Sequence, residues 1–333
     1  MNTTTITTQV TNSGMPAPHF SNCPELTQDD TALHAKPKSA KRVCQIESID
    51  YLDSKTEMGY VFFVKQIDGS HSQLKWQWSF NETKNLPEIG SSLLIEHELP
   101  RLIHNQEMAL IEIIDWQAIQ PYYDHAYLQM LFNEVENEKY LINLLDIIAG
   151  ITDERLQKLL MDIFNEPTVA LPFVKLPASH NHHHSYPGGL LQHSVECAQW
   201  IDNIARTTLT PIEAELTITA ALLHDLGKIE TMSHSYGSQI VSHEIMTLAL
   251  IEPLLSELQQ HWKSGAHALR EMLSSSPSNA KFPKLPGTLL IKMADQYSTS
   301  LSARNMAFTG QPDYYYWASL KTPTSVQFFN RIS

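Results

Sequence analysis

The sequence predicts a mainly α-helical protein whose helical domain follows a small β-barrel domain. Two patterns support this fold class. Between residues 41 and 116, short apolar or alternating runs are separated by turn residues, and beyond Pro121 apolar residues recur at spacings of three and four. Alternation with a period of two is typical of strands, whereas the longer period is typical of helices that bury one face.

Composition and charge limit the class of protein. The chain has 333 residues, of which 42% are hydrophobic and 18% charged, as in globular proteins, and it is long enough for one large or two ordinary domains. No apolar run reaches the roughly 18 residues that a membrane span needs, and the first residues do not resemble a secretory signal. The three cysteines (Cys23, Cys44, Cys197) are too few and scattered for a disulfide framework. We therefore expect a cytoplasmic protein without a membrane partner.

Residues 1–40 are rich in Thr, Ser, Asn and Pro, and we expect a disordered tail there. The five apolar runs that follow predict five strands, VCQIESI, GYVFFVKQI, LKWQWSF, SLLIEHEL and MALIEII. Five is the strand count of an OB-fold, so residues 41–118 are predicted to form an OB-like barrel.

Three alternating aromatic residues of this domain share one face of a predicted strand: Trp76, Trp78 and Phe80. They could stack on the bases of a single-stranded nucleic acid or fill the barrel core. The net charge of −13 argues against strong non-specific nucleic-acid binding, although it does not exclude a substrate held locally. Residues 41–116 also contain more acidic than basic side chains, and the core interpretation is therefore favoured.

The helical pattern predicts elements over 126–149 and 153–164, then a loop with Pro167, Pro172 and Pro177. Gly188-Gly189 opens the next helix. Thr210-Pro211-Ile212-Glu213 is a helix start that combines a capping Thr with a Glu three residues later, and this helix is predicted to stop at Gly227. Further helices are predicted from Ser242 to about Gln260 and from Pro286 or Thr288 onward, with no strand after residue 120. The helical domain is thus placed at 119–310, with a C-terminal tail at 311–333.

Three of these helices carry groups that can bind metal in otherwise apolar surroundings: His193, His224-Asp225 and Asp295. A buried charged Asp is destabilising by several kcal/mol unless a partner compensates it. Alone, the His-Asp pair would fit a helix end that emerges into water. Two imidazoles and two carboxylates from three helices instead suit one divalent ion, such as Mn, Fe, Co, Ni or Zn.

The stretches ASHNHHHSYPGGLLQHSVECA, ALLHDLGKIE and KMADQYS, in this order, resemble the HD superfamily of metal-dependent phosphohydrolases. The resemblance covers about residues 160–300. It is closest to the YhaM-type 3′–5′ exonucleases, which also carry an OB-like domain ahead of the HD domain, and to the TraI-like HD domain family. It implies an all-helical HD domain with His193, His224, Asp225 and Asp295 as the metal ligands.

The resemblance also implies hydrolysis of a phosphate ester with help from the bound metal. Asp225 would orient the attacking hydroxide, and Lys228 would hold a non-bridging phosphate oxygen, although a Lys at a helix end can also be structural. Two further residues are candidates for substrate binding. One is His243, which could equally lie on the surface, and the other is His184, from the run His182-His183-His184.

One stretch departs from the resemblance. Where YhaM-type and binuclear HD proteins usually carry a His-His pair, this chain reads Ser274-Ser275-Ser276. Serine is a poor ligand for such ions, so a mononuclear or degenerate site is expected and exonuclease activity is put in doubt.

We therefore expect a metal-dependent phosphodiesterase, an exonuclease-like hydrolase of single-stranded RNA or DNA. A nucleotide phosphohydrolase and an inactive metal-binding HD module for protein interaction are the alternatives. An oligomer is compatible with the resemblance, since some such proteins form rings.

Overall fold

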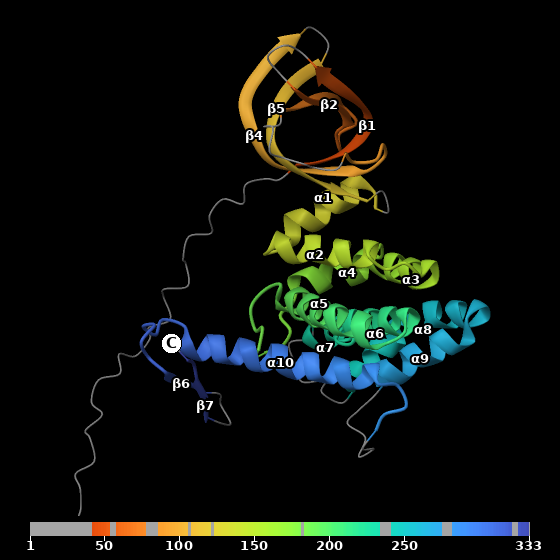
Figure 1. Cartoon of the computed structure of the whole chain (residues 1–333), viewed down its shortest axis with the longest axis vertical. Helices are drawn as coiled ribbons and strands as arrows, with labels where there is room; N and C mark the ends of the chain where they lie inside the picture. The colour runs from red at the N-terminus through yellow and green to blue at the C-terminus, as the bar shows by residue number, and fades with distance from the viewer. Residues whose placement is uncertain are drawn as a thin grey trace, which may run out of the picture. The chain divides into compact units, whose positions relative to one another are not determined.

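The computed structural model describes residues 42–53, 58–77, 86–105, 108–120, 123–180, 183–233, 241–274, 282–321 and 326–332, with backbone only for residues 53 and 96–115 (Figure 1). The tail predicted over residues 1–40 lies outside the described residues.

The five strands predicted at the start of the chain are present. They are β1 (Arg42–Asp53), β2 (Met58–Lys65), β3 (His71–Gln77), β4 (Ser92–Asn105) and β5 (Met108–Ile119). They pair in the order β1-β2-β3-β5-β4, and β4 pairs back onto β1, which closes the ring. The β3–β5 pairing is parallel and the other four pairings are antiparallel.

The barrel buries its inward-facing aromatic residues. Trp76 is 2% exposed, and its ring meets the edge of Trp116 at a centroid distance of 5.4 Å. Phe62 lies at the same distance from Trp116 and is fully buried. The core interpretation of Trp76 is therefore confirmed, whereas Trp78 and Phe80 lie outside the described residues.

The rest of the chain is mainly helical. Its helices are α1 (His125–Glu134), α2 (Glu138–Ala149), α3 (Glu154–Phe164), α4 (Pro167–Lys175), α5 (Gly189–Thr208), α6 (Pro211–Leu223), α7 (Lys228–Ser233), α8 (His243–His261), α9 (Lys263–Ser274) and α10 (Gly287–Phe308). The predicted helix start at Thr210 is confirmed, since the Thr210 side chain and Glu213 form a reciprocal capping box.

Helix α6 is the centre of this bundle, and residues 214–223 are all buried. A helix that is buried on every side is covered by other elements. Helix α5 packs along α6, and the long helix α10 contacts both (Figure 1). Helices α5 and α10, together with the turn that follows α6, carry the four groups expected to bind metal.

Several sequence-based expectations need correction. The element predicted over 126–149 is two helices, α1 and α2, and the helix expected to stop at Gly227 ends at Leu223. The proline-rich segment expected to be a loop contains α4, because Pro167 occupies the first helical turn, where its missing N–H has no helical partner. Strands β6 (Trp317–Lys321) and β7 (Val326–Asn330) form a hairpin, so the expectation of no strand after residue 120 is wrong. Aromatic and β-branched residues in this segment favour strands. Helix α9 was not predicted.

No helix among the described residues is both long enough and apolar enough to cross a membrane.

One buried carboxylate ties α6 to the start of α3. Glu215 accepts hydrogen bonds from Thr152 N at 2.9 Å, Thr152 Oγ1 at 2.6 Å and Asp153 N at 2.8 Å. Burial opposes the charge of this carboxylate, but the hydrogen bonds from Thr152 and Asp153 hold its pKa below the ordinary value. The ionised form is therefore the one that stabilises this junction.

We predict that Glu215→Ala lowers the free energy of unfolding at pH 7 by about 2–3 kcal/mol, because two backbone N–H groups lose their acceptor. Because the folded pKa is lowered, this stabilisation is present above the ordinary carboxyl pKa and is lost as the pH falls through the folded value. Urea unfolding of the wild type and the variant from pH 7 to pH 3 measures it. An equal difference in unfolding free energy between wild type and variant at all pH values, or no difference at pH 7, would contradict this role of ionised Glu215.

Candidate metal centre

The turn after α6 places His224 and Asp225 at the centre of the candidate site. Asp225 is 2% exposed, and its carboxylate faces four nitrogen atoms. They are Lys228 Nζ at 2.5 Å, His193 Nε2 at 3.2 Å, His243 Nε2 at 3.2 Å and His224 Nε2 at 3.5 Å. Asp225 is thus the group around which the predicted site residues gather.

Asp295 completes the expected set from α10. Its Oδ1 lies 3.3 Å from His193 Nε2, and its side chain is 43% exposed. His193 is fully buried, whereas the His243 side chain is 36% exposed. The site therefore has a closed side at His193 and an open side at Asp295 and His243.

Two buried nitrogen atoms lack a hydrogen-bond partner. They are Nε2 of His193 and Nε2 of His224, both of which lie next to the carboxylates without a well-directed hydrogen bond. Nδ1 of His224 is held by the Ala221 carbonyl at 2.7 Å, so Nε2 is its remaining nitrogen. A buried polar atom without a partner is destabilising, and a cation between these nitrogens and the carboxylates would satisfy both groups.

The charges at the site favour a positive ion. Burial alone would lower the pKa of His193, but the carboxylates of Asp225 and Asp295 hold it well above its ordinary value. Burial would raise the pKa of Asp225, yet Lys228, His224 and His193 hold it well below the usual range. The field at His193 Nε2 therefore favours positive charge, as a metal-binding site requires.

A second set of donor groups includes a thiol. His193, His224 and Cys197 have potential ligand atoms within 4.8 Å of one another. Burial raises the pKa of Cys197, so its thiol keeps the proton that a metal ligand must lose. Its Sγ also lies 4.0 Å from Nδ1 of His193, on the side of the ring opposite Asp225 and Asp295. The set with two carboxylates is the better fit.

The remaining predicted residues divide into two groups. Lys228 and His243 both contact Asp225, as the sequence led us to expect for residues of one site. His184 is 2% exposed and lies behind His193 at a ring-centroid distance of 5.4 Å, and burial lowers its pKa to about 3. A buried ring of this kind is poorly placed to touch a substrate, in contrast to the expectation for His184.

His183, which was not singled out, also lies beside His193. Its ring centroid is 5.6 Å from that of His193, and its pKa is lowered to about 4 by burial and by the charge of Lys228. His182 lies outside the described residues, as do Ser275 and Ser276, while Ser274 is the last residue of α9.

The comparisons with known families agree with this geometry. Residues 190–300 match the HD domain model. That range contains His193, the His224-Asp225 pair and Asp295. Residues 129–235 match the TraI_2 family, described as "Putative helicase". Both matches fall on the helical part of the chain and support the HD superfamily for it. Comparisons with curated proteins and with solved structures give no match.

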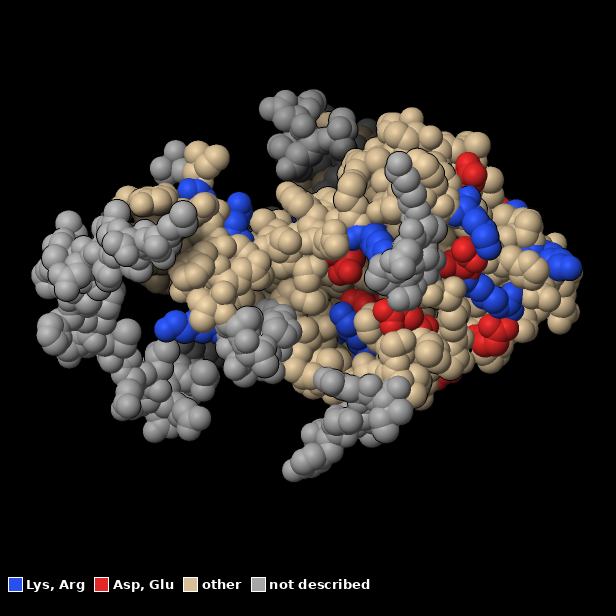
Figure 2. Space-filling model, turned by 90° about the horizontal axis from the view of Figure 1, so that it is seen from below, with Lys and Arg blue, Asp and Glu red and all other residues tan. Residues whose placement is uncertain are grey.

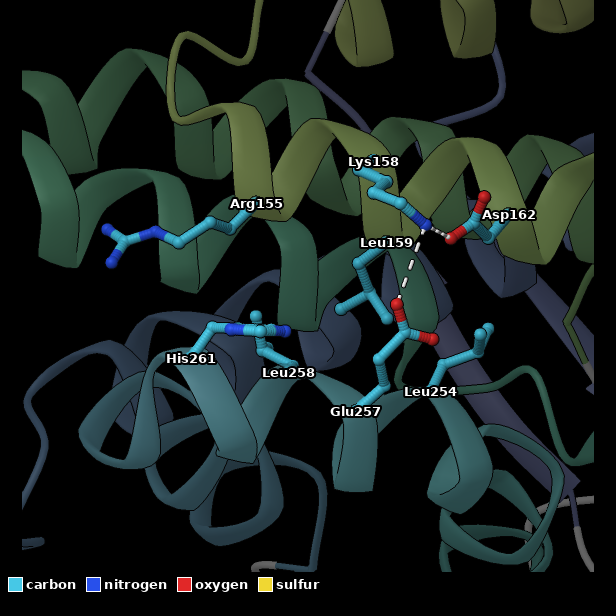
Figure 3. A pocket seen from close by; sticks show the side chains of 8 residues that line it. All are labelled: Arg155, Lys158, Leu159, Asp162, Leu254, Glu257, Leu258 and His261. Carbon is cyan, nitrogen blue, oxygen red and sulfur yellow. Dashed lines mark hydrogen bonds and ion pairs between the residues drawn. The ribbon is translucent and has the colours of Figure 1, made fainter.

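A separate pocket lies between α3 and α8, and its charged groups are already paired (Figure 3). Lys158 forms ion pairs with Asp162 and, at 3.9 Å, with Glu257. Arg155 pairs with Asp153 at 2.5 Å and lies over the Trp262 ring. Lys158 and Arg155 therefore both have partners within the protein. The site at Asp225 is the better candidate for binding a ligand.

Gly227 allows α8 to approach the turn that holds His224 and Asp225. Gly227 N donates to Thr247 Oγ1 at 2.8 Å, and Thr247 Oγ1 lies 3.3 Å from the His224 carbonyl oxygen. A Cβ atom on residue 227 would lie 2.1 Å from the His243 carbonyl oxygen and 2.4 Å from Thr247 N. Both are backbone atoms, so a side chain at this position would push α8 and His243 away from Asp225.

We predict that Gly227→Ala lowers the free energy of unfolding by about 2–4 kcal/mol, within the range of overpacked sites. Gly150→Ala is the matched control, because its added Cβ would meet its nearest neighbour, Asp146 O, at 3.2 Å. Chemical unfolding of both variants measures the difference. A Gly227→Ala protein as stable as the control would show that the close approach of α8 is not as described.

Proposed function

We propose that this chain is a metal-dependent phosphohydrolase whose ion is held by His193 Nε2, His224 Nε2, Asp225 and Asp295. The observation that carries the proposal is the pair of buried imidazole nitrogens without hydrogen-bond partners beside two carboxylates. The match of residues 190–300 to the HD domain supports it, since HD domains are typically metal-dependent hydrolases.

A divalent ion in such a site lowers the pKa of a bound water and polarises a phosphoryl oxygen. The chain's own residues supply the remaining functions. Asp225 would orient the attacking hydroxide. Lys228 places a positive charge at the same carboxylate, where it can pair with a non-bridging phosphate oxygen. His243 reaches solvent and can carry a proton between the site and water.

For the substrate, we propose a phosphodiester, with single-stranded nucleic acid as the first class to test. The resemblance to exonucleases and the strand order of the barrel support this choice. The proposal includes an OB-like domain at residues 41–118, a helical HD domain at 119–310 and a C-terminal tail at 311–333. On the face seen in Figure 2, Lys or Arg side chains lie among Asp or Glu on the right-hand part and are scattered on the left-hand part, without a continuous basic patch among the described residues there. Binding would therefore depend on local contacts rather than on a broad basic surface.

The direct test uses the full chain freed of metal and then supplied with Mn, Ni or Mg. Hydrolysis of bis-p-nitrophenyl phosphate and of labelled single-stranded RNA and DNA is measured. We expect metal-dependent turnover that Asp225→Asn abolishes, because the variant removes the charge that binds the ion. Asp162→Asn, on the exposed Lys158 pair, is the control and should keep full activity.

No turnover with any metal, or equal turnover in Asp225→Asn, would contradict the enzyme proposal and favour a binding module. Turnover of small esters or nucleotides without turnover of oligonucleotides would contradict the nucleic-acid substrate alone.

Lys228 gives a prediction with two readouts. Its ammonium competes with a metal ion for the Asp225 carboxylate, at 2.5 Å from Oδ2, and it would also stabilise transition-state charge. We expect Lys228→Met to leave metal affinity unchanged or higher while turnover falls by about 100-fold. Lys284→Met, at an exposed side chain, is the control.

Isothermal titration with Mn or Zn and steady-state kinetics measure the two effects. Unchanged turnover in Lys228→Met, or loss of metal binding in it, would contradict the role given to Lys228.

A further inference from the structure

A polar network that the metal centre does not use lies behind His193. Its central atom is Ser298 Oγ, on α10, one helical turn after Asp295. This oxygen lies 3.0 Å from His193 Nδ1, 3.0 Å from His184 Nε2 and 3.2 Å from Glu196 Oε2. Ser298 is 1% exposed, which leaves its hydroxyl little access to water. Among the described residues, its partners are these three groups.

The direction of each hydrogen bond follows from the inventory of protons. Glu196 also accepts from Tyr140 OH at 3.1 Å and from Gln192 Nε2 at 2.8 Å, so donors surround its carboxylate. An ionised carboxylate can only accept, so the proton between Ser298 and Glu196 comes from the serine hydroxyl. His184 Nε2 is a second possible acceptor of the serine proton, because Tyr186 OH donates to Gln192 Oε1 at 2.9 Å and therefore accepts from His184 Nδ1–H. A hydroxyl has a single proton, and with that proton on Glu196 or on His184 the Ser298 oxygen accepts from His193 Nδ1–H.

This direction decides which nitrogen of His193 faces Asp225 and Asp295. If a metal ion replaced the proton on Nε2, a ring that keeps its proton on Nδ1 would present the Nε2 lone pair on the side of the two carboxylates. Ligand histidines depend on such a partner at the other nitrogen to fix the tautomer and the ring orientation. We propose that Ser298, held by Glu196, is the positioning residue that sets His193 for metal binding.

The contact between Ser298 and Glu196 also joins two helices of the site. Ser298 and Glu196 come from α10 and α5, so their contact fastens the helix of Asp295 to the helix of His193. The hydrogen bond therefore fixes the distance between two proposed ligands as well as the tautomer of one of them.

This inference rests on the proposed metal site, and the test separates the two. The probe is Zn or Mn titrated into the full metal-free chain, with affinity measured by calorimetry and folding checked by thermal unfolding. We expect Ser298→Ala to weaken metal affinity by about 10- to 100-fold. Ser302→Ala is the matched control, because this buried hydroxyl on the same helix accepts from the His184 backbone N–H at 3.0 Å and not from a proposed metal ligand among the described residues. It should change metal affinity less than twofold.

Glu196→Gln is the sharper variant, because the side chain keeps its size. An amide facing Ser298 donates a proton to it, so the serine proton turns toward His193 Nδ1 or His184 Nε2, both at 3.0 Å, and the first of these favours the wrong His193 tautomer. We expect metal affinity to fall at least tenfold. In Zn-loaded wild type, ¹⁵N NMR of the imidazoles should show the proton of His193 on Nδ1.

Each outcome has one meaning. Wild-type protein that binds no metal contradicts the proposed function. Wild-type binding that Ser298→Ala and Glu196→Gln leave unchanged contradicts the positioning role alone, as does a Zn-loaded His193 that carries its proton on Nε2. Weakened binding in both variants, with folding and the Ser302→Ala control intact, supports the role of Ser298.

Discussion

The buried carboxylate of Asp225 is the constraint on which the helical part of this protein depends. A carboxylate that is 2% exposed at the end of an apolar helix is strongly destabilising unless positive or hydrogen-bonding groups surround it. Lys228, His193, His224 and His243 supply those groups from α5, the turn after α6, α7 and α8. The same requirement that stabilises the fold thus collects the residues of the candidate site.

The packing around Asp225 also sets what the site can do. Helix α10 brings Asp295 to His193, and the Gly227 turn admits α8 so closely that His243 reaches the same carboxylate. His193 is fully buried, whereas Asp295 and His243 reach solvent. This arrangement would allow a cation to bind on the buried side while a substrate enters from the open side. The pocket between α3 and α8 has no comparable set of groups (Figure 3).

The sequence predicted the parts of the site that depend on local pattern. His193, His224, Asp225 and Asp295 stood out because each interrupts an apolar helical face, and the strands and most helices followed from their periods. The roles of Ser298 and Glu196 could not be predicted, because serine and glutamate are ordinary helix residues and their meaning arises only when α5 and α10 meet. The same holds for His183 and His184, whose loop is placed by the left-handed backbone of Gly188 and by the packing of α5. Helix α4 was not predicted because its segment contains prolines, which usually indicate a loop. The β6–β7 hairpin was not predicted because its aromatic residues lie in a segment without the apolar alternation typical of strands.

The most direct test of this account is where a metal ion binds. Crystals of the full chain soaked in Zn or Mn would be measured at the absorption edge of the metal. We predict an anomalous peak at about 2.0–2.2 Å from His193 Nε2, His224 Nε2 and carboxylate oxygens of Asp225 and Asp295. A peak bonded to Cys197 Sγ and His193 Nδ1 instead, or no peak at Asp225, would contradict it.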